Sequence, residues 1–219
     1  MTALPFVIAI DGPAASGKGT LARRLAERFG FAHLDTGALY RAAALLVLDQ
    51  AGDPADPVAA AAAARRVDVP LLSDPRLRAN EVAGAASIVA AIPGVRRALL
   101  DLQRNFAAHP PKPAKGAILD GRDIGSVVCP AANVKLFVTA SAEERARRRV
   151  EELRQQGAAA ILDDVLQDLK ERDARDIERR AAPLIAASDA TVIDTTTLDA
   201  DAVFERVSGL IARALAAQR

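Results

Sequence analysis

The sequence has no tryptophan, one tyrosine and six phenylalanines among its 219 residues. Proteins that bind single-stranded nucleic acid stack the bases on aromatic side chains, so this composition argues against that class. Net charge is also small, because 29 basic and 28 acidic side chains leave a formal charge of +1. Such a chain has no general electrostatic field that attracts nucleic acid or an anionic membrane. Any anion must therefore be bound by a local arrangement of groups.

Cysteines and long apolar runs are scarce as well. Cys129 is the single cysteine, so no disulfide can form within the chain, and we expect a small packed side chain there rather than a nucleophile. The first residues, Met-Thr-Ala-Leu-Pro, lack the charged and apolar regions of a signal peptide. No apolar stretch reaches the roughly 18 residues of a membrane helix. We therefore expect a soluble, cytoplasmic protein without a membrane partner.

The apolar residues, 51% of the chain, suffice for the core of one α/β domain over residues 1–219. Short apolar runs predict strands at 6–10, 31–34, 117–120, 134–139 and 191–194. Amphipathic or capped stretches predict a helix that ends at Gly30, one that starts after Ser141, and others at 38–50, 57–67, 80–91, 93–107, 162–180 and 199–217. This alternation predicts a doubly wound, mainly parallel sheet of about five strands flanked by helices.

Ser141 and Glu144 have the spacing of a capping box, in which each side chain bonds the backbone N–H of the other residue. The helix that follows is rich in charge, as is the helix predicted at 162–180. Residues 141–180 contain ten basic and eleven acidic side chains. Most of the arginines Arg145, Arg147, Arg148, Arg149 and Arg154 are therefore expected to form solvated pairs at helical spacing rather than an anion site.

The motif Gly-Pro-Ala-Ala-Ser-Gly-Lys-Gly-Thr lies between the first strand and the first helix, where a phosphate-binding loop belongs. Small residues allow successive backbone N–H groups to surround a phosphate at the positive end of the helix dipole. We assign ATP binding to Gly12, Pro13, Ala14, Ala15, Ser16, Gly17, Lys18, Gly19 and Thr20. Gly19 separates the lysine from the hydroxyl of Thr20, and this variant of the loop resembles the nucleoside monophosphate kinases more than the small GTPases.

Asp120 ends the strand predicted at 117–120. A carboxylate at this place can orient Mg²⁺, usually through water, beside the phosphates of a nucleotide. A strand-end aspartate can also simply cap a turn or helix. Both interpretations of Asp120 stay open at the level of sequence.

Three later motifs carry a more specific resemblance. They are Leu-Asp-Thr-Gly-Ala-Leu-Tyr-Arg at 34–41, Asp-Gly-Arg-Asp-Ile-Gly at 120–125 and Lys-Glu-Arg-Asp-Ala-Arg-Asp at 170–176. Together with the loop, over nearly the whole length, they make the chain resemble the bacterial cytidylate kinases (CMP/dCMP kinases) of the P-loop class. The resemblance implies a small-molecule enzyme that phosphorylates CMP and dCMP with ATP and Mg²⁺. By analogy of fold we expect a monomer.

The resemblance also implies an adenylate-kinase-like division of the single domain. The core would comprise 1–40, 110–140 and 185–219, with a monophosphate-binding region over 41–109 and a lid over 141–180. Such a lid closes when both substrates are bound and so keeps ATP from water. The segment 69–81 is shorter than the corresponding insert in the longer enzymes of the family. Part of a small sheet in the monophosphate-binding region is therefore expected to be missing.

The acceptor site implied by the resemblance comprises Thr36, Arg41, Ser87, Arg96, Arg122, Asp123, Arg172, Asp176 and Arg179. Arg41, Arg122 and Arg179 would bind the acceptor phosphate, because a guanidinium group can hold two phosphate oxygens at once. The implied catalytic groups are Lys18, Arg122, Arg172 and Arg179. The family usually has serine at the position of Thr36; since the hydroxyl is retained, we expect the contact to survive.

The sugar and base contacts follow from the same resemblance. Arg172 and Asp176 would hold the sugar. Asp123 would accept a hydrogen bond from the 4-amino group of cytosine, while Ser87 and Arg96 complete the contacts. Uracil has an acceptor oxygen at the same position, which would face the Asp123 carboxylate, itself an acceptor, without a hydrogen bond.

Several residues and functions stay open. Arg148 and Arg175 are candidates for lid contacts to the transferred phosphate, and Tyr40 either packs beside the acceptor or serves structure alone. His33 and His109 have no partners at metal or triad spacing and are assigned nothing. A kinase of UMP, dTMP or another small acceptor is the nearest alternative function. A P-loop switch protein would need a guanine-reading Asn-Lys-x-Asp motif, which the sequence lacks.

Overall fold

The computed structural model describes residues 5–217 except 69, 156 and 180. Its centre is a five-stranded sheet with the order β2-β3-β1-β4-β5, in which every neighbouring pair runs parallel. The strands are β1 (Phe6–Asp11), β2 (Ala32–Asp35), β3 (Gly116–Gly121), β4 (Val134–Thr139) and β5 (Thr191–Asp194). The prediction of a doubly wound parallel sheet is confirmed, and each predicted strand lies within two residues of its observed bounds.

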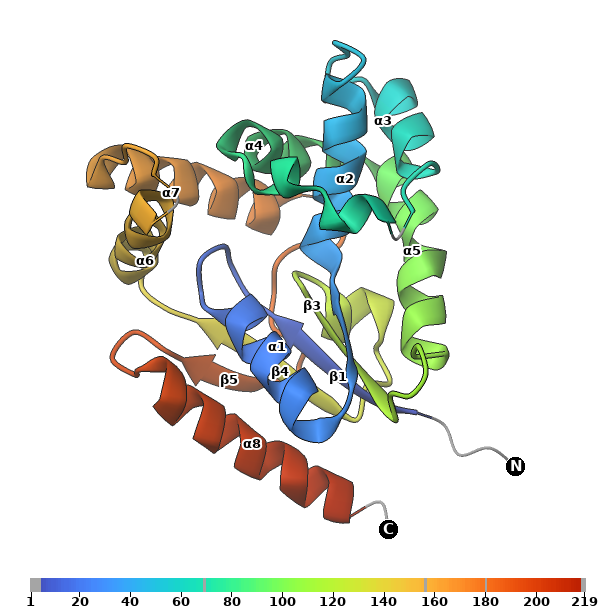
Figure 1. Ribbon diagram of the computed structural model, residues 1–219, viewed down its shortest axis with the longest axis vertical. Helices are drawn as coiled ribbons and strands as arrows, with labels where there is room; N and C mark the ends of the chain where they lie inside the picture. Colours follow the sequence, from blue (N-terminus) through green and yellow to red (C-terminus); the bar gives the residue numbers. More distant parts are fainter. Residues whose placement is uncertain (1–4, 69, 156, 180, 218–219) are drawn as a thin grey trace.

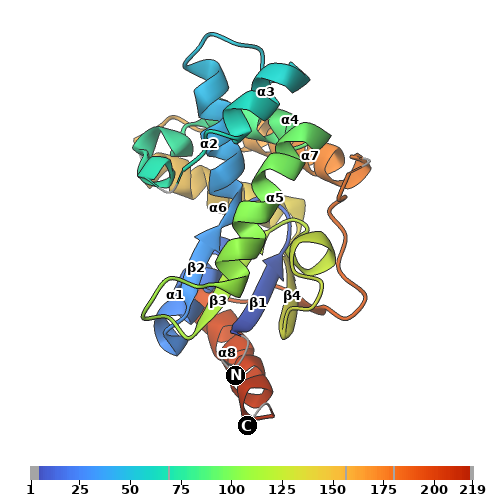
Figure 2. The same cartoon turned by 90° about the vertical axis from the view of Figure 1, so that its right-hand side faces the viewer.

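The sheet is buried on both faces, which explains why its central strands are almost wholly apolar. On one face Ile8 and Ile10 of β1 pack with α1 (Lys18–Phe29) and α8 (Ala200–Ala216). On the other face Ala9 and Leu119 join a second cluster with α5 (Pro93–Ala108). Figure 2 shows α5 running along that face. The two clusters hold β1, and hence the loop that follows it, in the middle of the molecule.

A helical extension rises above the carboxyl edge of the sheet (Figure 1). It is built from α2 (Thr36–Leu48), α3 (Pro57–Ala64), α4 (Asn80–Val89) and the short turns η1 (Pro70–Ser73) and η2 (Pro75–Arg78). Residues 41–109 contain no strand wherever the structure describes them, as the short segment 69–81 led us to expect. Residue 69 itself lies outside the described part.

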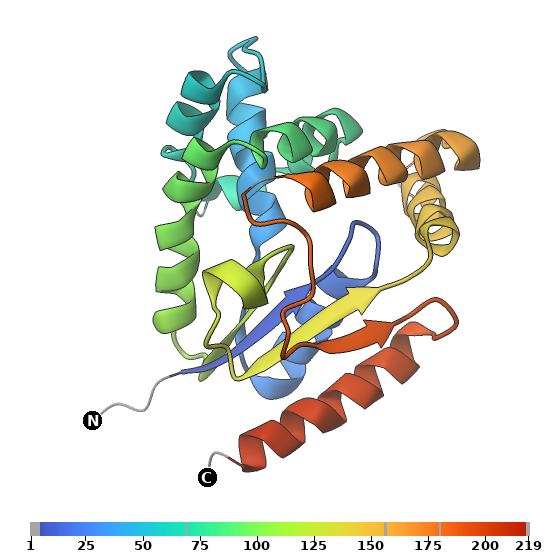
Figure 3. The same cartoon turned by 180° about the vertical axis from the view of Figure 1, so that it is seen from behind.

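Two charged helices, α6 (Ala142–Gln155) and α7 (Leu162–Glu178), form a second projection beside the first (Figure 3). They pack on each other, and the carboxyl-terminal half of α7 returns toward α4. The helix predicted over 162–180 ends at Glu178, and residue 180 lies outside the described chain. The element η3 was not predicted: β3 is followed by a single turn of π-helix at Ile124–Val128.

The helix caps correct the sequence analysis in part. Gly30 does close α1 in the left-handed conformation, with φ 65° and ψ 38°. The capping box at α6 is only half formed, because Glu144 N donates to Ser141 Oγ at 3.2 Å but Ser141 N donates to Thr196 Oγ1 at 3.0 Å. The carboxylate of Glu144 instead accepts from Arg148 Nε at 3.0 Å. The segment after β5 thus takes the place of the reciprocal bond.

In the described part of the chain, no single helix has the length and apolar character needed to cross a membrane. The helices α4 and α5, which meet at an angle of 100°, reach the required length and apolar composition only when they are counted together.

Candidate functional site

A cavity of about 880 Å³ lies at the carboxyl edge of the sheet, where α1 begins. In open α/β sheets this edge is where ligands bind, because the loops that follow the strands diverge there. The wall is formed by the loop before α1, the starts of α2 and α5, the end of β3, both charged helices and the segment after β5. One cavity thus joins all the motifs singled out in the sequence.

The loop of residues 12–17 depends on its glycines. Gly12 has φ 151°, and a Cβ there would lie 2.0 Å from Val138 O, so no other residue fits. Gly17 has φ 86° and directly precedes the first residue of α1, Lys18. The chain therefore turns sharply from β1 into α1 and presents the amino end of the helix to the cavity.

Lys18 is buried, and its Nζ donates to Pro13 O at 3.0 Å. Burial, and next the nearby Arg122, lower the pKa of this ammonium group to about 7, against the opposing charges of Asp120 and Asp35. A carbonyl oxygen balances the charge only in part. The loop is thus short of negative charge, and an anionic ligand would stabilise the protonated lysine.

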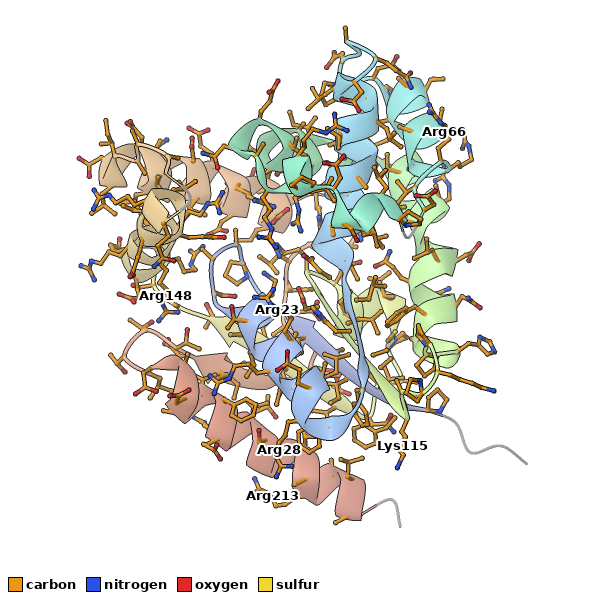
Figure 4. The ribbon with its side chains drawn as sticks, viewed as in Figure 1. Arg23, Arg28, Arg66, Lys115, Arg148 and Arg213 are labelled. Atoms are coloured by element: carbon orange, nitrogen blue, oxygen red, sulfur yellow. The ribbon has the colours of Figure 1, made fainter. Side chains whose placement is uncertain are left out.

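Beyond the loop, Arg148 and Thr195 form the next part of the wall. Two guanidinium nitrogens of Arg148 donate to Thr195, at 2.9 Å to Oγ1 and 2.6 Å to the backbone oxygen. Figure 4 shows Arg148 reaching from α6 toward the segment after β5. Thr195 was not predicted, and its only sequence signal is its position directly after a strand, at the edge where ligand loops gather.

On the opposite side of the cavity, carboxylates and guanidinium groups form a network. Asp176 of α7 accepts from Arg122 Nε at 2.9 Å and lies 3.5 Å from an Arg179 nitrogen. Burial raises the pKa of Asp176, but Arg122 and Arg179 hold it below its ordinary value. Asp123 is paired with Arg96 and lies 3.9 Å from Arg179. The network joins the end of β3 to two helices distant in sequence.

Arg172, one turn before Asp176 on α7, contributes a charge that is less well balanced. Its buried Nε has no hydrogen-bond partner among the described residues. Burial lowers its pKa to about 10, and Arg122 and Arg41 add repulsion. An anion between these arginines would relieve both effects.

The remaining predicted acceptor residues also line the cavity. Arg41 donates to Asp35 Oδ2 at 2.6 Å, and Thr36 Oγ1 donates to Asp120 O at 2.8 Å. Gly121 makes this approach possible, since a Cβ there would lie 2.5 Å from the Thr36 hydroxyl. The threonine hydroxyl therefore anchors α2 to β3 and keeps its lone pairs for a ligand.

Around Ser87, the end of the cavity is closed by side chains from four helices, α2, α4, α5 and α7. Ser87 Oγ accepts from Arg175 Nε at 3.2 Å, so Arg175 contacts α4 rather than the loop. Arg96 donates to Ala90 O at 3.2 Å and lies over the ring of Tyr40 at 5.5 Å. Tyr40 thus supports a cavity residue from below, through a cation–π contact.

Two charged or polar groups have partners that the sequence analysis did not identify. Arg145 is buried rather than solvated: it donates to Ala140 O at 3.0 Å, to Ala14 O at 3.2 Å and to Asp173 at 2.7 Å. It ties the loop to α7, which periodicity along one helix cannot show. His33, to which no partner was assigned, has its Nε2 2.7 Å from Asp120 Oδ2.

Asp11 is a further residue that the sequence analysis missed. Its carboxylate accepts from the backbone N–H of Ile124 at 2.7 Å and of Gly125 at 2.8 Å. Burial raises its pKa to about 6, although both hydrogen bonds favour the ionised form. Asp11 therefore fixes the start of η3, directly behind Arg122 and Asp123. Its place at the end of β1, next to the loop, was the available signal.

Comparison with known proteins identifies the family of this chain. The model of the family described as cytidylate kinase matches residues 8–213. A cytidylate kinase from Rhodospirillum rubrum is 60% identical over 197 residues, which are 90% of this chain and 92% of the relative. One from Paramagnetospirillum magneticum is 58% identical over 205 residues, 94% of this chain and 97% of the relative.

Among solved structures, that of an uncharacterized protein from Eubacterium ventriosum is similar with a TM-score of 0.54. Its sequence identity is 14%, and the match covers 94% of this chain and 98% of that one. At this identity the likeness concerns the fold alone.

Proposed function

The chain belongs to the cytidylate kinase family, and from this premise we propose that it transfers the γ-phosphoryl group of ATP to CMP or dCMP. The products are ADP and CDP or dCDP. The observation that carries the proposal is the single cavity, with a phosphate-binding loop on one side and an arginine–aspartate network on the other. A donor and an acceptor, both anionic, can meet there end to end.

On the donor side, the backbone N–H groups of residues 12–20 surround the β-phosphate, and Lys18 reaches the β- and γ-phosphates. The lowered pKa of Lys18 supports this role, because the charge lacks a full counterion in the protein. Arg148 lies beside Gly17 and Thr195, where it is suited to contact the part of ATP that is farthest from the acceptor.

ATP-dependent kinases use a divalent metal, and we propose Mg²⁺, which favours oxygen ligands and would help to neutralise the charge of the phosphates. No group of three or more His, Cys, Asp or Glu side chains able to hold a metal is found in the described part of the chain. The nucleotide and water must therefore supply most ligands. Asp120 fits as a carboxylate that would orient the metal through water. Its Oδ2 lies 3.9 Å from the point where a Cβ on Gly19, at the start of α1, would be.

On the acceptor side, Arg41, Arg122 and Arg179 bind the phosphate of CMP. Each already contacts a carboxylate, but a guanidinium group has five N–H donors and can serve both. Their pairing with aspartates supports this assignment, because it holds the planar groups in place before the substrate arrives.

Asp176 and Arg172 hold the sugar. Asp123, with Arg96 and Ser87, reads the cytosine 4-amino group. The pairing of Asp123 with Arg96 leaves its other oxygen 3.9 Å from Arg179, which supports an accepting role toward the base.

No general base is needed for this reaction. The second pKa of a phosphate monoester is about 6, so CMP already presents an anionic oxygen at neutral pH. Catalysis consists of holding donor and acceptor in line while Lys18, Arg122, Arg172 and Arg179 stabilise the charge on the transferred group. The absence of a histidine from the proposed catalytic set follows from this chemistry.

We further propose that residues 41–109 and 141–180 close over the core residues when substrates bind. Two contacts between these regions support such closure: Arg149 donates to Asn80 Oδ1 at 2.7 Å and Arg175 to Ser87. Both sides of the cavity come from one chain, which supports a monomeric enzyme. We place it in the cytoplasm, where its substrates are made.

The decisive experiment is an ADP-release assay with ATP and a panel of nucleoside monophosphates. We expect CMP and dCMP to stimulate ADP release far above UMP, dTMP, AMP and GMP. Preference for UMP or dTMP would move the enzyme to another acceptor. An ATPase rate that no monophosphate changes would instead favour a P-loop switch and overturn the proposal.

A further inference from the structure

His33 and Asp120 face each other on neighbouring strands below the loop. Parallel pairing aligns His33 with Ile118 and Asp35 with Asp120, so His33 lies two residues before Asp120 in register. Side chains two residues apart on paired strands share a face of the sheet. This places Nε2 of His33 2.7 Å from Oδ2 of Asp120, with side-chain exposures of 16% and 5%.

The contact restrains a carboxylate at the wall of the cavity. Oδ2 of Asp120 is held by His33, whereas Oδ1 accepts no hydrogen bond from any residue that the structure describes. Asp120 lines the cavity beside Gly19 and Thr20, close enough to Lys18 to raise its pKa. A carboxylate turns easily about its last torsion, so a single short hydrogen bond is enough to fix its orientation.

We propose that His33 is a positioning residue for the metal–nucleotide complex: its Nε2–H holds Oδ2 of Asp120 and thereby fixes the carboxylate that would face the divalent cation of bound ATP. This inference rests on the donor side of the proposed function. It requires no change of charge on His33, only a donor of fixed direction. Groups that orient a metal-site carboxylate in this way typically change metal affinity 10- to 100-fold when removed.

The structure also suggests why a histidine suits this place. β2 is the edge strand next to β3, so its residues can reach the strand end without crossing the core. A ring nitrogen on a short, stiff side chain fixes the direction of the bond better than a long flexible donor. The neighbouring Asp35 is not free for the task, because it caps α2 through Ala38 N and holds Arg41.

The test compares His33→Leu, which removes the donor, with His33→Gln, which retains an N–H group at similar reach. Free Mn²⁺ is measured by electron paramagnetic resonance during titration of each enzyme saturated with the non-hydrolysable analogue AMP-PNP. A parallel calorimetric titration with AMP-PNP in EDTA reports nucleotide affinity without metal. Asp120→Asn serves as the reference for loss of the carboxylate.

We expect His33→Leu to weaken Mn²⁺ binding by about tenfold, in the direction of Asp120→Asn, with metal-free nucleotide affinity unchanged. His33→Gln should stay within about twofold of wild type. Wild-type Mn²⁺ affinity in His33→Leu would overturn the inference. So would an equal loss of metal-free nucleotide binding, since that indicates a purely structural role. Should His33→Leu fail to fold, His33→Val, which suits an edge strand, replaces it.

The design separates this inference from the proposed function. No acceptor is present, so an error about CMP leaves the outcome unaffected. If wild-type enzyme bound neither AMP-PNP nor its Mn²⁺ complex, the donor site itself would be wrong. If both bound and only the histidine variant behaved as wild type, the positioning role alone would fail.

Discussion

The donor and acceptor sides of the cavity are built in opposite ways. The proposed donor side is mainly one continuous segment, residues 12–20, whose backbone N–H groups and single lysine would bind the phosphates of ATP. The acceptor side brings together side chains from five separate elements, joined by ion pairs such as Arg122 with Asp176. Local chain geometry makes the first; tertiary packing makes the second.

Charge is handled differently as well. Among the described residues, Nζ of Lys18 donates a hydrogen bond only to a carbonyl oxygen, and the pKa of Lys18 is lowered to about 7. Arg122, Arg179 and Arg96 are already paired with aspartates. The donor side therefore depends on its ligand for charge balance, whereas these three acceptor-side arginines, unlike Arg172, are paired in advance and must share their guanidinium groups with the substrate. The predictions below separate these two designs.

The largest effect is expected on the donor side. Lys18→Ala should lower kcat at least 10²-fold, because it removes a preorganised charge from the transferred phosphoryl group. The melting temperature should not fall, since a buried ammonium group is itself unfavourable. Lys115→Ala, at the amino end of β3 and exposed (Figure 4), is the control and should leave the rate unchanged. Residual activity above about a tenth of wild type would refute the loop assignment.

On the acceptor side, Arg122→Ala and Arg179→Ala should each weaken CMP binding by about 10- to 100-fold while leaving ATP affinity within about twofold. A hydrogen bond to a charged group contributes about 1.5 to 3 kcal/mol, which sets this range. Separate calorimetric titrations with CMP and with ATP measure both. The exposed Arg97, next to Arg96 in sequence, supplies the control Arg97→Ala. Equal losses for both ligands would assign these arginines to the donor.

Asp123→Asn tests the chemistry of the base. An asparagine can present an oxygen or an N–H, so it should lower kcat/KM for CMP and narrow the preference for CMP over UMP. A mismatched buried polar pair costs about 1 to 3 kcal/mol, so the ratio should fall by roughly one to two orders of magnitude. Because Asp123 also pairs with Arg96, an alternative is that it only positions its neighbours. Equal losses for both acceptors, with an unchanged ratio, would favour that alternative.

The smallest effect concerns pH and distinguishes the two sides directly. With a pKa of about 7, the charged fraction of Lys18 falls about eightfold between pH 7.5 and 8.5 in the free enzyme. Phosphates stabilise the charged form, so ATP binding should take up a proton and its Kd should rise about eightfold over this range. CMP affinity should stay nearly constant. Calorimetry in two buffers of different ionisation enthalpy measures the proton uptake, and parallel changes for both ligands would contradict the assignment.

Much of the fold could be predicted because its signals are local. Each strand is a short apolar run, and Gly30 and the glycines of the loop mark turns that other residues cannot make. The prediction failed where a residue's partner comes from another element. Thr196 replaced half of the capping box, and η3 forms where Asp11, over a hundred residues earlier, accepts its first N–H groups.

The sequence by itself determined three things: the succession of strands and helices along the chain, the phosphate-binding loop, and the residue types available to bind the acceptor. Backbone conformation and hydrophobic periodicity depend on residues that are close in sequence, so a single amino-acid sequence is enough to predict them. Only the tertiary structure decided which charges meet: Arg145 with the loop and α7, His33 with Asp120, and Arg96 with Asp123. Such pairs depend on burial and on distances between segments far apart in sequence, which packing of the whole chain alone creates.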